Sequence, residues 1–172
     1  IGVNRIVFSQ SISDVVYKFG SSEPIHNDTY MKFPLTGDHS VYSISKNTAV
    51  YLHQHYQAEY GIQTYILRLP TIYAYHPNRF YFVNGQKKWL GYRLLIEKAY
   101  IGDTIEIWGN PENKKELVYV KDFVKIVEGA LITSTPGEIF NVANGFAISF
   151  EEQIKTMISV LNPPDKESSL VY

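Results

Sequence analysis

The pattern of hydrophobic and polar positions predicts a strand, a helix and a second strand in the first part of the chain. Residues 5–8 form a short apolar run that gives way to the hydroxyl-rich segment 9–13, as a strand does before a polar turn. Residues 40–60 have the helical period, and Gly61 is placed to end that helix. Residues 64–69 form a continuous β-rich run stopped by a proline, which is typical of a strand buried on both faces. This order predicts a βαβ unit with parallel strands.

The rest of the chain predicts further helices and strands separated by turn residues. An aromatic-rich stretch covers residues 71–84. Helices are predicted over 87–100, over 122–132 with Asp122 as its cap, and from a Ser149/Glu152 capping box to 161, with strands over 104–108, 114–120 and 138–143. The tail beyond the two prolines at 163–164 is expected to fray.

Composition excludes several classes of protein. With 45% hydrophobic and 19% charged residues among 172, the chain is expected to be globular. A net charge of −1 gives no indication of nucleic acid or an anionic membrane as a partner. The absence of cysteine excludes disulfides, thiolate nucleophiles and Cys-ligated metals, and the two helical histidines His53 and His55 are not spaced for a metal, so none is expected. Without a membrane-length apolar run or a signal pattern, we expect a cytoplasmic protein.

Tyr42 and Lys46 are the strongest candidates for chemistry. Positions four apart on a helix share one face, so a phenol and an ammonium can address the same site. An ammonium stabilises a phenolate, which proton transfer by tyrosine at neutral pH requires. About one such spacing is expected by chance in a chain this rich in Tyr and Lys, so taken alone it is more often a surface pair.

The surroundings of this pair favour a site. Hydroxyl side chains at Ser9, Ser11 and Ser13 follow the first strand, and the second strand ends just before Thr71. Open α/β sheets bind ligands at the carboxyl ends of their strands, so these segments are predicted to meet at one edge. The alternative is that the serines only cap the turn.

Five segments, in the same order along the chain, carry a resemblance to a known family. They are 7–11 (VFSQS), 42–46 (YSISK), 67–73 (LRLPTIY), 107–122 (IWG, then KELVYVKD) and 138–143 (EIFNVA). Together they resemble the C-terminal part of an extended short-chain dehydrogenase/reductase, of the NAD-dependent sugar epimerase/dehydratase group. The resemblance implies an α/β fold in two parts: residues 1–73 as the C-terminal portion of a Rossmann-type catalytic domain, and 74–172 mainly as a smaller α/β substrate-binding lobe with some segments returning to the first domain.

The resemblance also implies roles for individual residues. Tyr42 would be the acid/base, and Lys46 would hold the nicotinamide ribose and activate Tyr42. Ser11 would hydrogen-bond the reacting oxygen, with Ser9 as the alternative if the register slips by two. Lys115 would grip the phosphate or ribose of a nucleotide-linked sugar. The catalytic group is thus Ser11, Tyr42 and Lys46; the cofactor-binding group is Tyr42, Lys46, Leu69, Pro70 and Thr71; the substrate-binding group is Ser11, Thr71 and Lys115.

The chain departs from the family pattern in several places. Thr71 stands where many members have Asn, Ala74 where a Gly is usual, and Lys115 where an Arg is usual. The glycine-rich phosphate turn should lie well before the catalytic serine, yet ten residues precede Ser11 and no Gly-x-Gly-x-x-Gly occurs. We therefore interpret the chain as an incomplete fragment that lacks the N-terminal dinucleotide-binding half and cannot turn over by itself.

The expected function is that of an NAD- or NADP-dependent epimerase, dehydratase or reductase that acts by hydride transfer on a nucleotide-linked sugar. The resemblance also suggests a homodimer built in part from helix 40–60. The alternative is a non-catalytic regulatory protein of the same fold that binds a dinucleotide or a sugar nucleotide. A third reading is an unrelated α/β domain with a coincidental Tyr-x-x-x-Lys, which would bind no nicotinamide.

Overall fold

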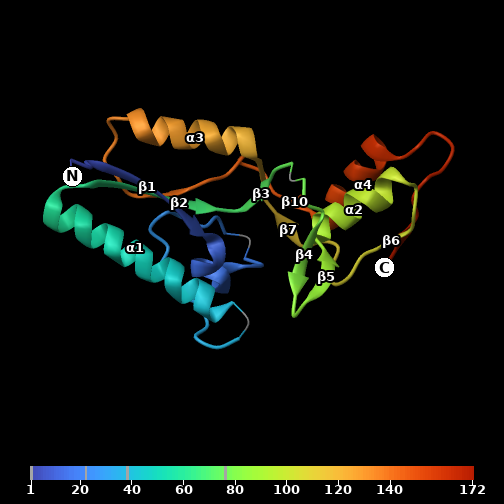
Figure 1. The fold of residues 1–172 in the computed structure, drawn as a ribbon, viewed down its shortest axis with the longest axis horizontal. Helices are drawn as coiled ribbons and strands as arrows, with labels where there is room; N and C mark the ends of the chain where they lie inside the picture. Colours follow the sequence, from blue (N-terminus) through green and yellow to red (C-terminus); the bar gives the residue numbers. More distant parts are fainter. Residues whose placement is uncertain (1, 22, 38, 76) are drawn as a thin grey trace. The chain divides into compact units, whose positions relative to one another are not determined.

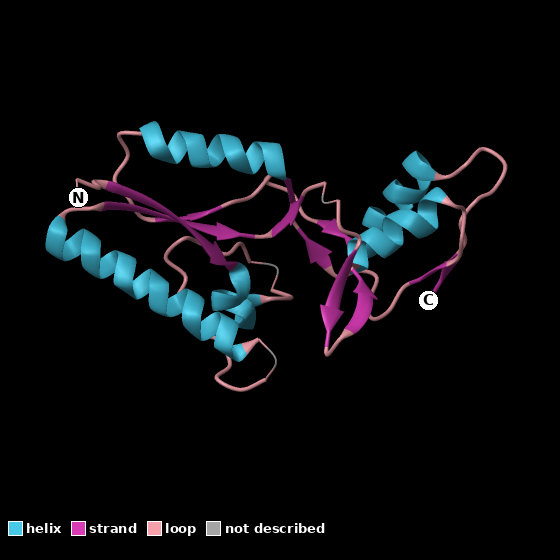
Figure 2. Cartoon of the chain, viewed as in Figure 1, coloured by secondary structure: helices cyan, strands magenta, loops and turns pink. Residues whose placement is uncertain are grey.

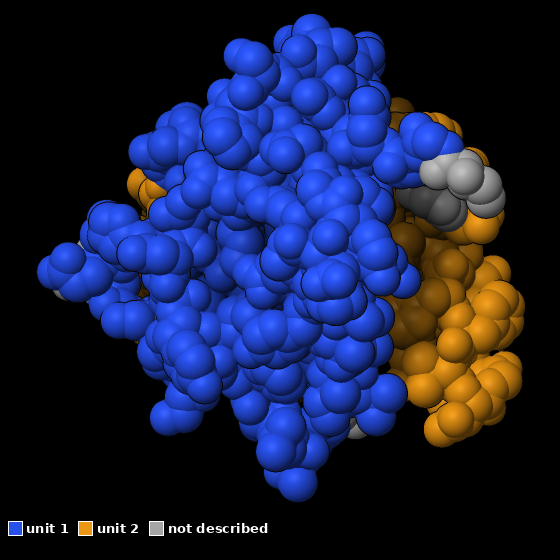
Figure 3. Space-filling model, turned by 90° about the vertical axis from the view of Figure 1, so that its left-hand side faces the viewer, with its two compact units in different colours: residues 1–73, 116–146 blue, residues 74–115, 147–172 orange. Residues whose placement is uncertain are grey.

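The computed structural model describes residues 2–21, 23–37, 39–75 and 77–172, and the chain divides into two compact units. Unit 1 contains Ile1–Tyr73 and Glu116–Phe146, and unit 2 contains Ala74–Lys115 and Ala147–Tyr172 (Figure 3). Each unit is therefore built from two separate stretches of the sequence. Within the described residues, none of the helices has the length and apolar character that a membrane span needs.

Unit 1 is built on a three-stranded parallel sheet in the order β1 (Arg5–Ser11), β2 (Gln63–Leu69), β9 (Ile139–Asn141). Between β1 and β2 runs α1 (Ser40–Tyr60), so the predicted βαβ unit is confirmed. Figure 1 shows α1 along one face of this sheet and α3 (Val120–Ile132) along the other. The helix predicted over 40–60 has these bounds because Gly61 adopts the left-handed conformation (φ 68°) that ends it.

The core of unit 1 lies between the sheet and α3. Leu67, Val118 and Val142 are its buried centre. Val118 belongs to β8 (Leu117–Tyr119), which pairs in parallel with β3 (Thr71–Tyr73). On the opposite face of the sheet, the Thr64 hydroxyl donates a hydrogen bond to the Gln57 side chain of α1 at 2.6 Å. The sheet is therefore covered by α3 through apolar contacts and by α1 partly through polar ones.

Strand β1 runs further than the sequence predicted. Residues 9–11 were expected to form a turn, but they continue the ladder to β2 up to the pair Ser11 and Leu69. The turn begins one residue later as a short 3-10 helix, η1 (Ile12–Lys18), for which Ser11 is the N-cap. Backbone pairing with β2 therefore outweighs the turn preference of the hydroxyl residues.

Unit 2 contains a hairpin, two helices and short strand pairs (Figure 2). Its core consists of Ala99, Ile105, Ile107 and Ile154, with partly buried apolar side chains packed around them. Its elements are β4 (Phe80–Val83), β5 (Gln86–Trp89), α2 (Gly91–Tyr100), β6 (Ile105–Glu106), β7 (Lys114–Lys115), β10 (Ile148–Ser149), α4 (Phe150–Leu161) and β11 (Leu170–Val171). The predicted Ser149/Glu152 capping box of α4 is confirmed.

Three predictions for the rest of the chain are wrong. The helix expected over 87–100 begins at Gly91, because Asn84-Gly85 forms a turn with positive φ at both residues and folds 80–89 into the β4–β5 hairpin. The tail does not fray, since β11 pairs with β6. The N-cap of α3 is Tyr119, and Asp122 lies in the first helical turn, where it contacts Lys125.

Candidate active site

Helix α1 places Tyr42 and Lys46 one turn apart beside the carboxyl end of β1. Lys46 Nζ donates a hydrogen bond to the backbone carbonyl of Ser9 at 2.7 Å. The same ammonium lies 5.9 Å from the centroid of the Tyr42 ring and 4.9 Å from that of Phe8. Tyr42 is 47% exposed, so its phenol is accessible to a ligand. The ammonium of Lys46 therefore contacts both the Tyr42 ring and the carboxyl end of β1, which distinguishes this pair from one on a free helix surface.

Ser11 closes β1 and opens the turn that follows. Its hydroxyl oxygen accepts a hydrogen bond from the backbone N–H of Ser13 at 3.2 Å, which caps η1. The suggestion that the serines cap the turn thus holds for Ser11. A hydroxyl that accepts in this way still has its own hydrogen to donate to a ligand oxygen. Capping and a role in the site are therefore compatible.

The end of β2 lies directly beside Ser11. Leu69 is its register partner, so the last residues of the two strands are neighbours. Pro70 follows, and Thr71 begins β3. The chain therefore leaves the sheet at Leu69, Pro70 and Thr71, the candidate cofactor-binding residues, beside the end of β1 at Ser11. Lys46 contacts β1 at Ser9, two residues before that end.

Lys115 belongs to unit 2, whereas the other candidate residues belong to unit 1. It lies in β7, and its Nζ is 5.4 Å from the centroid of the Phe150 ring. Partial burial lowers the pKa of the Lys115 ammonium. This placement makes Lys115 a half-buried cation of unit 2 rather than a fully solvated one.

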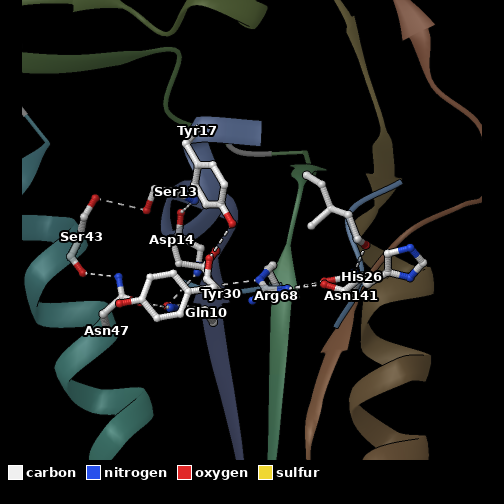
Figure 4. Close-up of polar contacts among 12 residues, drawn as sticks. Gln10, Ser13, Asp14, Tyr17, His26, Tyr30, Ser43, Asn47, Arg68 and Asn141 are labelled. Carbon is white, nitrogen blue, oxygen red and sulfur yellow. Dashed lines mark hydrogen bonds and ion pairs between the residues drawn. The ribbon is translucent and has the colours of Figure 1, made fainter. Parts of the chain in front are cut away.

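A layer of polar side chains, buried except for Asn141 at its end, lies beneath this edge and was not among the residues predicted from the sequence (Figure 4). It begins on α1, where Asn47 accepts a hydrogen bond from Gln10 at 3.2 Å. It continues through Asp14 of η1 to Arg68 of β2, with 2.9 Å between Asp14 Oδ2 and Arg68 Nε. Arg68 Nη1 then donates to Asn141 Oδ1 of β9 at 2.9 Å. Two sequence signals point to this layer: an arginine inside an apolar strand, and an acidic residue beside two valines.

The Asp14–Arg68 pair is the electrostatic centre of this layer. Both side chains are 1% exposed, so the pair is removed from solvent. Burial raises the pKa of the Asp14 carboxyl, and the opposing attraction of the Arg68 guanidinium does not cancel that effect. Asp14 Oδ1 and Arg68 Nη2 are buried and have no hydrogen-bond partner within the described part of the chain. Such a pair contributes little net stability, which favours a positional role for it.

Comparisons with known proteins identify the family and the fold of the chain. The model of the NAD dependent epimerase/dehydratase family matches residues 1–143. A curated relative, dTDP-4-dehydro-6-deoxy-D-allose reductase from Streptomyces bikiniensis, is 23% identical over 145 residues, which are 82% of this chain and 41% of the reductase.

Solved structures show the same fold. The UDP-N-acetylglucosamine 4-epimerase of Methanobrevibacter ruminantium M1, solved with UDP-N-acetylmuramic acid, has a TM-score of 0.72 at 19% identity and covers 98% of this chain and 54% of its own. The dTDP-glucose 4,6-dehydratase of Streptomyces venezuelae, solved with NAD bound, has a TM-score of 0.69 at 21% identity and covers 99% of this chain and 48% of its own.

The chain thus spans about half the length of these relatives, and their reactions differ: a reduction, an epimerisation and a dehydration. The α/β fold with a Rossmann-type parallel sheet, predicted from the sequence, is confirmed. The family match covers most of the chain and agrees with the predicted family and its use of NAD. The chain belongs to the NAD dependent epimerase/dehydratase family.

Proposed function

We propose that the chain carries the proton-transfer residues of an NAD(P)-dependent enzyme that converts a nucleotide-linked sugar by hydride transfer. The observation that carries this proposal is the hydrogen bond from Lys46 to the Ser9 carbonyl, which holds the Tyr42–Lys46 face of α1 against the carboxyl end of β1. Ligands of open α/β sheets bind at this edge. A phenol, an ammonium and a serine hydroxyl that meet a sugar at this edge would be suited to moving a proton at one of its oxygens.

Each side chain has a distinct part in the proposal. Tyr42 Oη takes the proton from a sugar hydroxyl, or returns one to a ketone oxygen, and Ser11 Oγ donates a hydrogen bond to the same oxygen. Lys46, whose ammonium lies 5.9 Å from the centroid of the Tyr42 ring, binds the ribose of the cofactor beside the phenol. Every step assigned to this chain is therefore the binding of an oxygen or the movement of one proton.

The residues present fit a nicotinamide nucleotide. An ammonium has three N–H donors, and the contact with Ser9 occupies one, which leaves Lys46 able to bind ribose hydroxyls. The backbone from Leu69 to Thr71, at the neighbouring strand end, would meet the carboxamide edge. The cofactor supplies hydride acceptance and donation when it is bound.

The proposed substrate class is a nucleotide-linked sugar. Ser11 and Thr71 would contact the sugar, and the Lys115 ammonium would meet a phosphate or ribose of the nucleotide. Lysine acts on a phosphate as a point charge, without the two parallel hydrogen bonds that arginine makes. This difference predicts weaker contacts to the diphosphate than an Arg at this position would give.

We also propose that α1 forms part of a homodimer interface. The outer face of this helix carries exposed apolar side chains. Among them are Val41 (80% exposed) and Leu52 (53% exposed), which lie on the same side of α1. A Leu52→Glu change is expected to shift the protein from dimer to monomer in sedimentation experiments. A dimer that persists in this variant contradicts the interface.

The test of the proposed function uses the protein as its source cell makes it. The protein is incubated with NAD or NADP and a panel of UDP- and dTDP-sugars, and the products are followed by NMR spectroscopy. The proposal predicts an epimerised, dehydrated or reduced sugar from at least one of them. Binding of cofactor and sugar nucleotide without any conversion, as measured by calorimetry, would establish the non-catalytic alternative. Binding of neither ligand would contradict both.

A further inference from the structure

The segment that joins η1 to α1 is fastened to the carboxyl ends of β2 and β9. Arg68 Nη1 donates a hydrogen bond to the backbone carbonyl of His26 at 3.2 Å. Asn141 Nδ2 donates one to the carbonyl of Ile25, the residue before. Because Arg68 Nη1 also donates to Asn141 Oδ1, the two side chains and the two carbonyls form one connected group. The middle of a long connection is thus held by two strands.

The base of this connection is also closed. The backbone N–H of Lys32 donates to the carbonyl of Asp14 at 2.8 Å. The Tyr17 hydroxyl donates to the carbonyl of Tyr30 at 3.0 Å. The chain therefore leaves η1, passes over the ends of β2 and β9 at Ile25 and His26, and returns to η1. A segment fixed at both its base and its middle keeps one position relative to the sheet.

Arg68, which holds the segment at His26, lies one residue pair along the sheet from the candidate active site. Arg68 is the register partner of Gln10 on one side and of Asn141 on the other. The next pair along β1 and β2 is Ser11 and Leu69, where the candidate site begins. Any displacement of the segment at Ile25 and His26 therefore occurs beside the edge at which ligands of this fold bind.

Asp14 orients the guanidinium that makes this contact. Its carboxylate binds Arg68 Nε, and a guanidinium is planar, so fixing Nε also fixes the direction of Nη1. The pair is buried and leaves one polar atom on each partner without a hydrogen-bond partner among the described residues, which is a poor arrangement for stability alone. Its geometry suits a side chain that must point in one direction.

We propose that Arg68 and Asn141, oriented by Asp14, are positioning residues that clamp Ile25 and His26 across the strand ends and so set one wall of the active site. This inference rests on the proposed function, because the wall bounds the place where cofactor and sugar would lie. The clamp acts through the backbone of the segment. Its loss is therefore expected to weaken ligand binding more than it slows proton transfer.

The test compares Asn141→Ala and Arg68→Met with a matched control, Arg5→Met. Arg5 also holds two backbone carbonyls, those of Ala130 and Thr133 at 2.8 Å each, but it does so from the start of β1, at the opposite end of the strand. Asn141 is exposed, so its replacement by alanine is expected to leave the fold intact. It carries the test even if Arg68→Met fails to fold.

Two readouts are needed. Hydrogen–deuterium exchange of residues 23–32 is expected to become about tenfold faster in Asn141→Ala, as the loss of a hydrogen bond predicts, and unchanged in Arg5→Met. In the same protein, made as its source cell makes it, KM for the sugar nucleotide is expected to rise about fivefold or more in the clamp variants, with kcat within about twofold of wild type. The control is expected to change neither quantity, even if it lowers the melting temperature.

Unchanged exchange and unchanged KM in Asn141→Ala would overturn the clamp, and so would equal effects in Arg5→Met, since those would follow from stability alone. The exchange readout does not depend on activity. Faster exchange at 23–32 in a protein that converts no sugar nucleotide therefore supports the clamp and contradicts the proposed function. Unchanged exchange at 23–32 in Asn141→Ala, in a protein that does convert a sugar nucleotide, would contradict the clamp and support the proposed function.

Discussion

Asp14 Oδ2 lies 2.9 Å from Arg68 Nε, and burial nevertheless raises the pKa of the Asp14 carboxyl above its ordinary value of 3.8. The folded protein therefore holds a proton at Asp14 at pH values where the unfolded chain has released it. In that window the folded state binds more protons than the unfolded state, so the free energy of unfolding falls as pH rises through it. The stability that protonated Asp14 contributes is present at low pH and is lost toward the folded-state pKa.

The variant Asp14→Asn tests whether Asp14 makes the free energy of unfolding fall as pH rises. The amide keeps the shape and does not titrate, so the difference in unfolding free energy, wild type minus variant, is expected to decrease as pH rises from 3.8 toward neutrality. Urea unfolding at a series of pH values measures the difference. A difference that increases with pH would show that attraction to Arg68 outweighs burial and would contradict the assigned direction.

Lys46 is expected to matter for the cofactor. Lys46→Met removes the ammonium that contacts Ser9 and leaves its apolar stem, so KM for the nicotinamide cofactor should rise about ten- to a hundredfold, the effect of a lost hydrogen bond to a charged group. Steady-state kinetics with varied cofactor gives this number. Lys125→Met is the control, since Lys125 is an exposed partner of Asp122 on α3. Equal KM values in the two variants would exclude the assigned role of Lys46.

The capping box of α4 predicts a local effect on stability. Ser149 Oγ accepts from the backbone N–H of Glu152 at 3.1 Å, and the Glu152 carboxylate accepts from the backbone N–H of Ser149 at 2.7 Å. Ser149→Ala is expected to lower the free energy of unfolding by about 1 kcal/mol. Ser159→Ala, on the exposed side of the same helix, should change it by less than about 0.5 kcal/mol. Thermal or urea unfolding of both variants makes the comparison, and an equal loss in both would argue against the cap.

The elements that the sequence predicted well are those defined by local signals. Helix α1 has its predicted bounds because the helical period and Gly61 lie within the helix itself or next to it. The capping box of α4 is equally local. The short pattern of β5 predicts the start of a helix, whereas the hairpin turn at Asn84-Gly85 makes it a strand. The pairing of β11 with β6 joins segments too far apart in sequence for any local pattern to show.

The same distinction applies to the candidate site. The spacing of Tyr42 and Lys46 on one helix, and the position of Ser11 after the first apolar run, were enough to predict that these residues lie near one strand end. The contact of Arg68 with Asn141 joins residues 73 positions apart, and its contact with Asp14 joins residues 54 apart. Such contacts depend on which strands become neighbours in the sheet. The proposed clamp therefore depends on the three-dimensional fold, although its charged residues lie in an apolar stretch of sequence.

The most direct test of the account is kcat of Tyr42→Phe, measured in the protein as its source cell makes it. Tyr100→Phe is the control, since it removes the hydroxyl of another exposed tyrosine, at the end of α2. If Tyr42 moves the proton, kcat falls by a factor of about a hundred or more, while cofactor affinity stays within about twofold of wild type. Turnover of Tyr42→Phe equal to that of wild type and of Tyr100→Phe would contradict the proposed role of this site.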